Sequence, residues 1–102
     1  MAPCTVFVVE DDVDTRDMMG RFLELEGFKV EVAANGKQAL ERLNAGIHPC
    51  VILLDLMMPV MDGWQFRSQQ IRDAALASIP VIVVSAAGKE RIADIEANAY
   101  LS

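Results

Sequence analysis

The stretch that decides the fold is "VILLDLMMPVMDG", residues 51–63, where an apolar run ends abruptly on the carboxylate of Asp55. A short continuous apolar run predicts a strand that is buried on both faces. Eight residues without a helix signal follow Asp55, which disfavours a helix-capping role for it. The carboxyl ends of parallel strands are where ligand sites form, so Asp55 is the first candidate for chemistry.

Strands and helices are predicted to alternate along the whole chain. Apolar or alternating runs predict strands at residues 5–9, 29–33, 50–54 and 79–85, and helical periodicity predicts helices within 15–28, 36–46, 62–75 and 89–99. The stripes that support the first three helices are Met18, Phe22 and Leu25, then Ala39, Leu40 and Leu43, then Phe66 and Ile71. Four alternations predict a parallel α/β sheet with helices on both faces.

Composition excludes several classes of protein. The 102 residues suit one small domain, and 53% hydrophobic with 24% charged residues is a globular composition. The net charge of −6 argues against direct binding to nucleic acid. No apolar run is long enough to span a membrane, and the amino terminus lacks the basic segment of a signal peptide.

Two cysteines, Cys4 and Cys50, each stand at the start of an apolar run. Their spacing fits no zinc motif. A disulfide between them is one interpretation, but without a secretory signal we expect two buried free thiols.

Acidic and hydroxyl side chains follow three of the predicted strands. Glu10, Asp11 and Asp12 follow the first strand, Asp55 follows the third, and Ser85 ends the fourth. If the first and third strands are neighbours, Glu10, Asp11 and Asp55 converge and repel one another unless a cation lies between them. Oxygen ligands in a shallow, partly hydrated site favour Mg²⁺. Such an ion would also prepare the place for a phosphoryl group, with the Ser85 hydroxyl nearby.

Three segments resemble the receiver domain of two-component response regulators: "VFVVEDD" at 6–12, "LLDLMMPVMDG" at 53–63 and "VIVVSA" at 81–86. The acidic pair alone is a weak signal, whereas the run around Asp55 is specific, and the resemblance covers essentially the whole chain. It implies a flavodoxin-like, doubly wound parallel sheet with strand order 2-1-3-4-5, and a signalling switch in place of an enzyme.

The resemblance also implies roles for individual residues. Asp55 would accept a phosphoryl group from the phosphohistidine of a sensor histidine kinase or a phosphotransfer protein. Asp11 would bind Mg²⁺ directly, Glu10 would act through metal-bound water, and Asp55 and the backbone carbonyl of Met57 would complete the protein ligands. Gly63 would open the next helix.

The end of the chain holds two further residues with implied roles and one difference from the family pattern. Ser85 stands at the switch hydroxyl position of the family and Tyr100 at its switch aromatic position. The family lysine after the fifth strand would fall just beyond Ser102, and Lys89 does not replace it. We therefore expect a receiver domain, residues 1–102, that is incomplete at the fifth strand, lacks the last helix and is phosphorylated poorly.

This departure leads to a structural expectation. The fourth strand, residues 79–85, would become an edge of the sheet with no charged side chains to block pairing with another chain. Apolar side chains on the sheet face beside the first helix would be exposed. We expect marginal stability and self-association through this end. The sequence leaves open whether an effector domain follows in a longer protein, and it predicts a cytoplasmic location.

Two other functions fit parts of the sequence. A phosphatase of the haloacid dehalogenase type also uses an aspartyl phosphate and Mg²⁺, and "DVD" at 12–14 resembles its motif superficially. However, Arg16 stands where that family has a small polar residue, and we interpret Asp12 and Asp14 as helix N-terminal acids. A flavin-binding module on the same fold would need a phosphate cradle rich in Ser, Thr and Gly, which the loops lack.

Overall fold

A computed structural model describes residues 4–84 and 99–101 of the chain. The strands are β1 (Thr5–Val9), β2 (Lys29–Ala33), β3 (Val51–Leu54), β4 (Val81–Val84) and β5 (Ala99–Leu101), and the helices are α1 (Val13–Leu25), α2 (Gly36–Asn44) and α3 (Gly63–Arg72). All neighbouring strands run parallel, in the order β2-β1-β3-β4-β5. The predicted flavodoxin-like order is confirmed. The helix predicted within 89–99 falls almost entirely outside the described residues.

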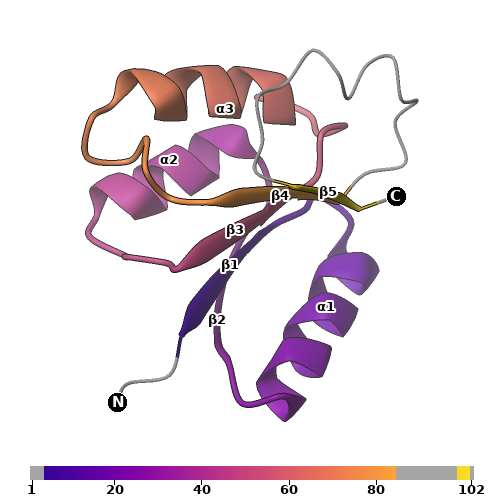
Figure 1. Ribbon diagram of the computed structural model, residues 1–102. Helices are drawn as coiled ribbons and strands as arrows, with labels where there is room; N and C mark the ends of the chain where they lie inside the picture. Colours follow the sequence, from indigo (N-terminus) through magenta and orange to yellow (C-terminus); the bar gives the residue numbers. More distant parts are fainter. Residues whose placement is uncertain (1–3, 85–98, 102) are drawn as a thin grey trace.

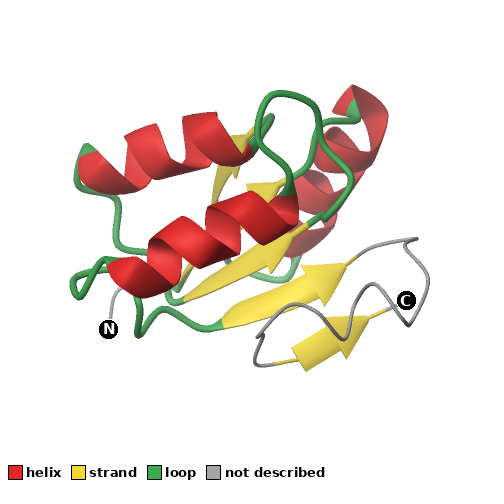
Figure 2. Cartoon of the chain, turned by 90° about the horizontal axis from the view of Figure 1, so that it is seen from above, coloured by secondary structure: helices red, strands yellow, loops and turns green. Residues whose placement is uncertain are grey.

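The helices cover the sheet from both sides (Figures 1 and 2). α1 lies on one face, while α2 and α3 lie together on the other. β2 forms one edge of the sheet, as its alternating sequence predicts. Within the described ranges, none of the helices has the length and apolar character that crossing a lipid bilayer requires.

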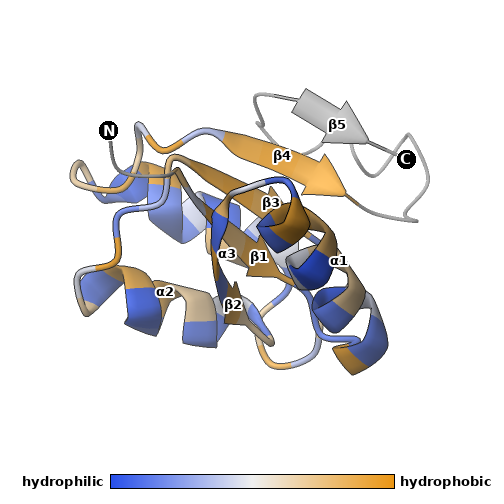
Figure 3. Cartoon of the chain, turned by 90° about the horizontal axis from the view of Figure 1, so that it is seen from below, coloured by the Kyte–Doolittle hydropathy of each residue, from blue (hydrophilic) through white to orange (hydrophobic). Residues whose placement is uncertain are grey.

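The main core lies between the sheet and the pair α2 and α3. Phe7, Ile52 and Leu54 from the sheet are fully buried against Ala39 and Phe66 from these helices. β1, β3 and β4 are the most apolar strands, whereas the outer surfaces of α2 and α3 are polar (Figure 3). The removal of these apolar side chains from water is the main force that holds the sheet and the two helices together.

α1 carries its apolar stripe on the outside. Met18, Phe22 and Leu25 are 65%, 63% and 86% exposed, although they lie at helical spacing. The sheet side of α1 is formed instead by small or partly buried residues, with Gly20 next to the Val30 side chain. These exposed side chains belong to α1 itself, and the expectation for the sheet face beside the first helix stays a prediction.

The expectation that the fourth strand forms an edge is wrong. β5 pairs with β4 in parallel register, with Ile82 opposite Ala99 and Val83 opposite Tyr100. The three residues of β5 satisfy backbone groups that β4 would otherwise expose. The expected self-association therefore loses its strand-edge argument and stays a prediction.

The expectation of two free, buried thiols is also wrong. Cys4 and Cys50 form a disulfide, with their Cα atoms 6.0 Å apart, and Cys50 is exposed. The cause is strand pairing, because both residues come directly before adjacent parallel strands, with Val6 opposite Val51.

The inner side of α3 contains polar groups that the apolar pattern did not predict. Ile71, expected inward, is 39% exposed, whereas Gln70 is fully buried. The Gln70 amide donates hydrogen bonds to the carbonyls of Leu76 (2.9 Å) and Ile79 (3.1 Å), and its oxygen accepts one from the buried Arg67 guanidinium (2.8 Å). Gln70 thus ties the connection after α3 to the helix that precedes it.

We predict that Gln70→Ala lowers the free energy of unfolding by about 2–4 kcal/mol, because it removes three hydrogen bonds from buried groups and leaves a cavity. Gln69→Ala, on the exposed face of the same helix, is the matched control and should change it by less than about 0.5 kcal/mol. Urea unfolding of both variants measures the difference. Equal effects of the two substitutions would contradict this role of Gln70.

Candidate functional site

Three carboxylates meet at the carboxyl edge of the sheet. Glu10 and Asp11 follow β1, and Asp55 follows the neighbouring strand β3. The backbone fixes their relative positions, because Asp55 N–H donates to the Val9 carbonyl (3.0 Å) and Glu10 N–H donates to the Ala33 carbonyl (3.0 Å). One carboxylate oxygen from each of the three acids lies within 4.8 Å of the others. The expected convergence of Glu10, Asp11 and Asp55 is therefore confirmed as geometry.

The proximity of these acids changes their protonation. Burial, followed by the hydrogen bond and charge of Asp55 and then the charge of Asp11, raises the pKa of Glu10 from 4.5 to about 8. Partial burial and the Asp55 carboxylate also raise the pKa of Asp11. Without a cation, the cluster at neutral pH thus holds a proton that isolated carboxylates would have lost.

The donor set fits a hard divalent cation. Glu10 Oε2 is buried and accepts no hydrogen bond within the part of the chain that the structure describes. A buried carboxylate oxygen without a donor is unfavourable, and a cation would satisfy it while relieving the repulsion among the three acids. Oxygen ligands alone suit Mg²⁺ better than they suit softer metals.

The structure describes two of the other three predicted site residues, Met57 and Tyr100. Met57 lies two residues after Asp55 and is 54% exposed, and its N–H donates to Asp55 Oδ1 (3.4 Å). Tyr100 lies in β5, opposite Val83 of β4 in the register of the sheet. Ser85 lies outside the described residues.

The loop from Met57 to Asp62 is held by short local contacts. Asp62 caps α3 by accepting a hydrogen bond from Gln65 N–H, and the Gln65 side chain accepts one from Asp62 N–H in return. Val60 has a φ of +68°, and the Met61 N–H donates to the Pro59 carbonyl (2.8 Å), which closes a tight three-residue turn. Positive φ is unfavourable for a β-branched residue, so the loop after Asp55 contains backbone strain.

Two glycines allow this loop to lie close to the sheet. A Cβ on Gly63 would lie 2.7 Å from the Asp55 carbonyl oxygen and 2.8 Å from Leu56 Cα. A Cβ on Gly36 would lie 2.9 Å from the Met61 carbonyl oxygen, which accepts a hydrogen bond from Gly36 N–H at 2.9 Å. The sequence pattern marked Gly63 as the opening of the helix but did not mark Gly36, whose only sequence signal is the Asn35–Gly36 pair before α2.

Arg16 and Asp12 complete the surroundings of the cluster. Arg16 Nη1 donates to the Glu10 carbonyl (3.0 Å), a contact for which the sequence holds no signal. Asp12 caps α1, because its Oδ2 accepts hydrogen bonds from the backbone and hydroxyl of Thr15, and these bonds lower the pKa of Asp12. Asp12 is therefore a helix cap, as predicted, and is not the nucleophile that the haloacid dehalogenase alternative requires.

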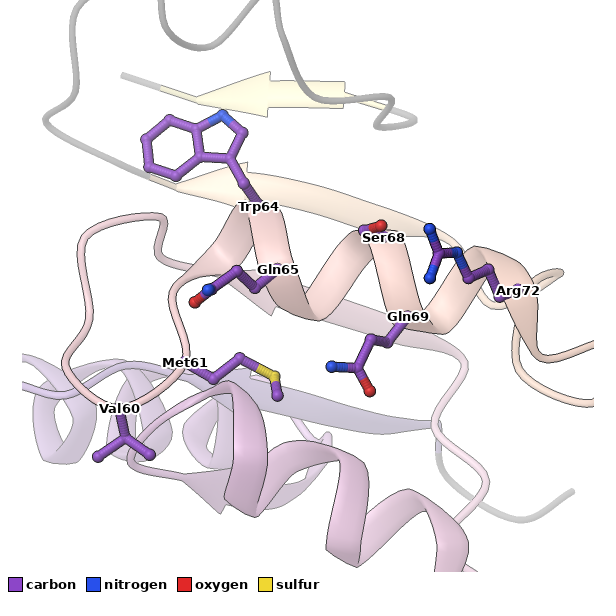
Figure 4. Close-up of a pocket in the computed structure, with 7 residues that line it drawn as sticks. All are labelled: Val60, Met61, Trp64, Gln65, Ser68, Gln69 and Arg72. Atoms are coloured by element: carbon purple, nitrogen blue, oxygen red, sulfur yellow. The ribbon is translucent and has the colours of Figure 1, made fainter.

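A surface hollow of about 380 Å³ lies beside α3 (Figure 4). Its lining comes from the loop after Asp55 and the outer face of α3: Val60, Met61, Trp64, Gln65, Ser68, Gln69 and Arg72. Figure 4 places the Trp64 indole on the side of α3 away from Val60 and Met61. The lining contains no carboxylate and does not include the acidic cluster, so the hollow is not the centre of the candidate chemistry.

Comparison with known proteins defines the family. Residues 6–102 match the response regulator receiver domain family, and the chain belongs to this family. The chain is 37% identical over 87 residues to the response regulator Rre1 of Synechocystis sp. and 36% identical over 85 residues to a CpxR homolog of Haemophilus influenzae, described as a transcriptional regulatory protein. These alignments cover 84% and 83% of this chain, but only 37% and 35% of the relatives.

Solved structures agree with this assignment. The N-terminal domain of a response regulator receiver protein from Methanoculleus marisnigri is 34% identical, with a TM-score of 0.81 over 95% of this chain and 81% of that chain. The chemotaxis protein CheY4 of Vibrio cholerae is 27% identical, with a TM-score of 0.89 over 98% of this chain and 86% of that chain. The chain is thus a CheY-like signalling domain, and acidic residues that bind Mg²⁺ are a general feature of such receiver domains.

We predict that Gly63→Ala destabilises the domain by about 2–4 kcal/mol, because the added methyl group overlaps the backbone of Asp55 and Leu56. Gly20→Ala is the matched control, since its added methyl group would lie 3.8 Å from Val30 Cγ1, an ordinary contact. Gly20→Ala should stabilise α1 by up to about 1 kcal/mol. Thermal unfolding of both variants tests the comparison, and a neutral Gly63→Ala would show that the loop can move aside.

We also predict a pH dependence of stability in the absence of metal. Between about pH 4.5 and pH 8 the folded protein retains a proton on Glu10 that the unfolded chain has lost, so the free energy of unfolding falls as the pH rises through this window. Glu10→Gln cannot titrate and should show a flatter profile. Urea unfolding in the presence of a chelator, repeated at several pH values, measures both proteins. Parallel profiles would contradict the assignment of this proton to Glu10.

Proposed function

We propose that Asp55 is the phospho-acceptor of this receiver domain and that Glu10, Asp11, Asp55 and the backbone carbonyl of Met57 hold the Mg²⁺ on which the reaction depends. The observation that carries the proposal is the convergence of three carboxylates within 4.8 Å at the carboxyl edge of the sheet. Asp11 would be a direct ligand, and Glu10 would act mainly through metal-bound water. When bound, the ion would share the negative oxygens of a phosphoryl group and so favour its transfer.

The chain itself supplies the nucleophile and its position. An oxygen of the Asp55 carboxylate attacks phosphorus, the O–P bond forms, and the N–P bond to the donor histidine breaks. The backbone hydrogen bond from Asp55 to Val9 keeps the nucleophile at the end of β3. In the proposal, the Ser85 hydroxyl contacts a phosphoryl oxygen afterwards, and Tyr100 acts as the switch aromatic that reports the change to the surface.

We propose two kinds of partner. A sensor histidine kinase or a phosphotransfer protein would donate the phosphoryl group, and an effector domain would receive the signal. The length of the relatives supports the second partner, because the chain spans 35–42% of the first six curated relatives it matches, and one of these is described as a transcriptional regulatory protein. A kinase phosphohistidine is made from ATP, which is held inside the cell, so we place the domain in the cytoplasm.

We predict that acetyl phosphate with Mg²⁺ adds the mass of one phosphoryl group to the protein and that Asp55→Asn abolishes the addition, because the amide is not an anionic nucleophile. Intact mass spectrometry measures the yield. Chelation of Mg²⁺ or Asp11→Ala should reduce the yield at least about tenfold.

Asp14→Ala is the matched control, because it removes an acid from the first turn of α1 that is not part of the cluster. It should leave the yield close to that of the parent protein. Phosphorylation of Asp55→Asn would exclude Asp55 as the acceptor. An equal loss in Asp14→Ala and Asp11→Ala would show that general charge, and not the cluster, controls the reaction.

A further inference from the structure

The disulfide between Cys4 and Cys50 lies at the end of the sheet opposite the acidic cluster. Cys4 precedes β1 and Cys50 precedes β3, whereas Glu10 and Asp55 follow the same two strands. The backbone alone brings the cysteines together, because Cys50 N–H donates to the Thr5 carbonyl (2.9 Å) and the Cα atoms lie 6.0 Å apart. This separation is in the usual range for a disulfide, so the bond requires no rearrangement of the strands.

The location of the pair makes it accessible to small redox molecules. Cys50 is exposed and Cys4 is partly exposed, so the pair lies at the surface, where small reagents can approach it without unfolding of the core. In the cytoplasm, where we place the domain, glutathione and thioredoxin keep most thiols reduced. The same pair would therefore be a dithiol under ordinary conditions and a disulfide under oxidising ones.

We propose that Cys4 and Cys50 form a reversible oxidation site, whose co-reactant is a low-molecular-weight disulfide such as oxidised glutathione. One cysteine thiolate attacks a sulfur of the small disulfide, and the first small thiol leaves. The second cysteine thiolate then attacks the mixed disulfide, and the second small thiol leaves. The protein loses two electrons and two protons, and one small disulfide becomes two thiols.

The expected consequence of oxidation is a more stable domain. The bond joins residues 46 positions apart, and the closed loop contains β1, α1, β2 and α2. Cross-linking a loop of this length restricts the unfolded chain far more than the folded one, where the two strands are already paired. The acidic cluster should be unaffected, because the Asp55–Val9 hydrogen bond fixes the opposite end of the same strands independently.

The test uses the whole 102-residue chain in buffers with different ratios of reduced to oxidised glutathione. Thiols are trapped with a maleimide and counted by intact mass. Both thiols should disappear together, in a monomer, and the melting temperature should rise by roughly 10–20 °C relative to the reduced protein. Two free thiols in fully oxidised glutathione, disulfide-linked dimers, or an unchanged melting temperature would each overturn the proposal.

Variants separate the bond from other effects of oxidation. Cys4→Ser and Cys50→Ser should each stop at the mixed disulfide with glutathione and show no rise in melting temperature. The double variant should melt at the same temperature in both buffers, and a redox-dependent melting temperature in this variant would contradict the assignment to this pair.

The acetyl phosphate reaction distinguishes this proposal from the proposed function. The phosphorylation yields of the oxidised and reduced protein should agree within about twofold, because the two sites lie at opposite ends of the strands. A larger difference would overturn the claim that the bond acts on stability alone. Absence of phosphorylation in both forms would count against Asp55 as acceptor and would leave the oxidation site unaffected.

Discussion

The pairing of β1 with β3 is the interaction on which the rest of this structure depends. Parallel pairing places the residues after both strands at one edge of the sheet, so Glu10, Asp11 and Asp55 must share a small volume. Burial, together with the contact and charge of Asp55, raises the pKa of Glu10 to about 8, and one Glu10 oxygen is buried without a donor among the described residues. The three clustered carboxylates repel one another in the protein without a cation, and a bound cation would relieve this repulsion.

The loops next to the acidic cluster pack closely against the sheet and against each other. Gly63 lets α3 begin against the backbone of Asp55, and Gly36 lets the start of α2 hydrogen-bond to the loop at Met61. Val60, in the loop between Asp55 and α3, has a positive φ and forms a strained turn. Backbone strain next to Asp55, the proposed phospho-acceptor, is a feature often found in loops that switch between two arrangements.

Much of this could be predicted from sequence, because the strong signals are local. Continuous apolar runs predicted the buried strands, and the residues after them predicted the acidic cluster. Gly27 and Gly46 stand just after α1 and α2 and both adopt positive φ, as glycines after helix ends commonly do. The strand order came from the resemblance to receiver domains.

The features that could not be predicted from sequence depend on tertiary contacts. Periodicity identified the stripe of Met18, Phe22 and Leu25 but not which elements cover it, and in the structure these residues are exposed. The disulfide depends on which strands are neighbours, and cysteine spacing alone does not contain that information.

A divalent cation that binds where Glu10, Asp11 and Asp55 meet is the feature on which the proposed chemistry rests. The most direct measurement is an NMR titration with paramagnetic Mn²⁺, which prefers the same oxygen ligands as Mg²⁺. We expect the amide signals of residues 10–12 and 55–57 to broaden first and to recover when excess Mg²⁺ competes. Broadening centred on other acids, such as Glu24 and Glu26 at the far end of α1, or no recovery with Mg²⁺, would contradict binding at this cluster.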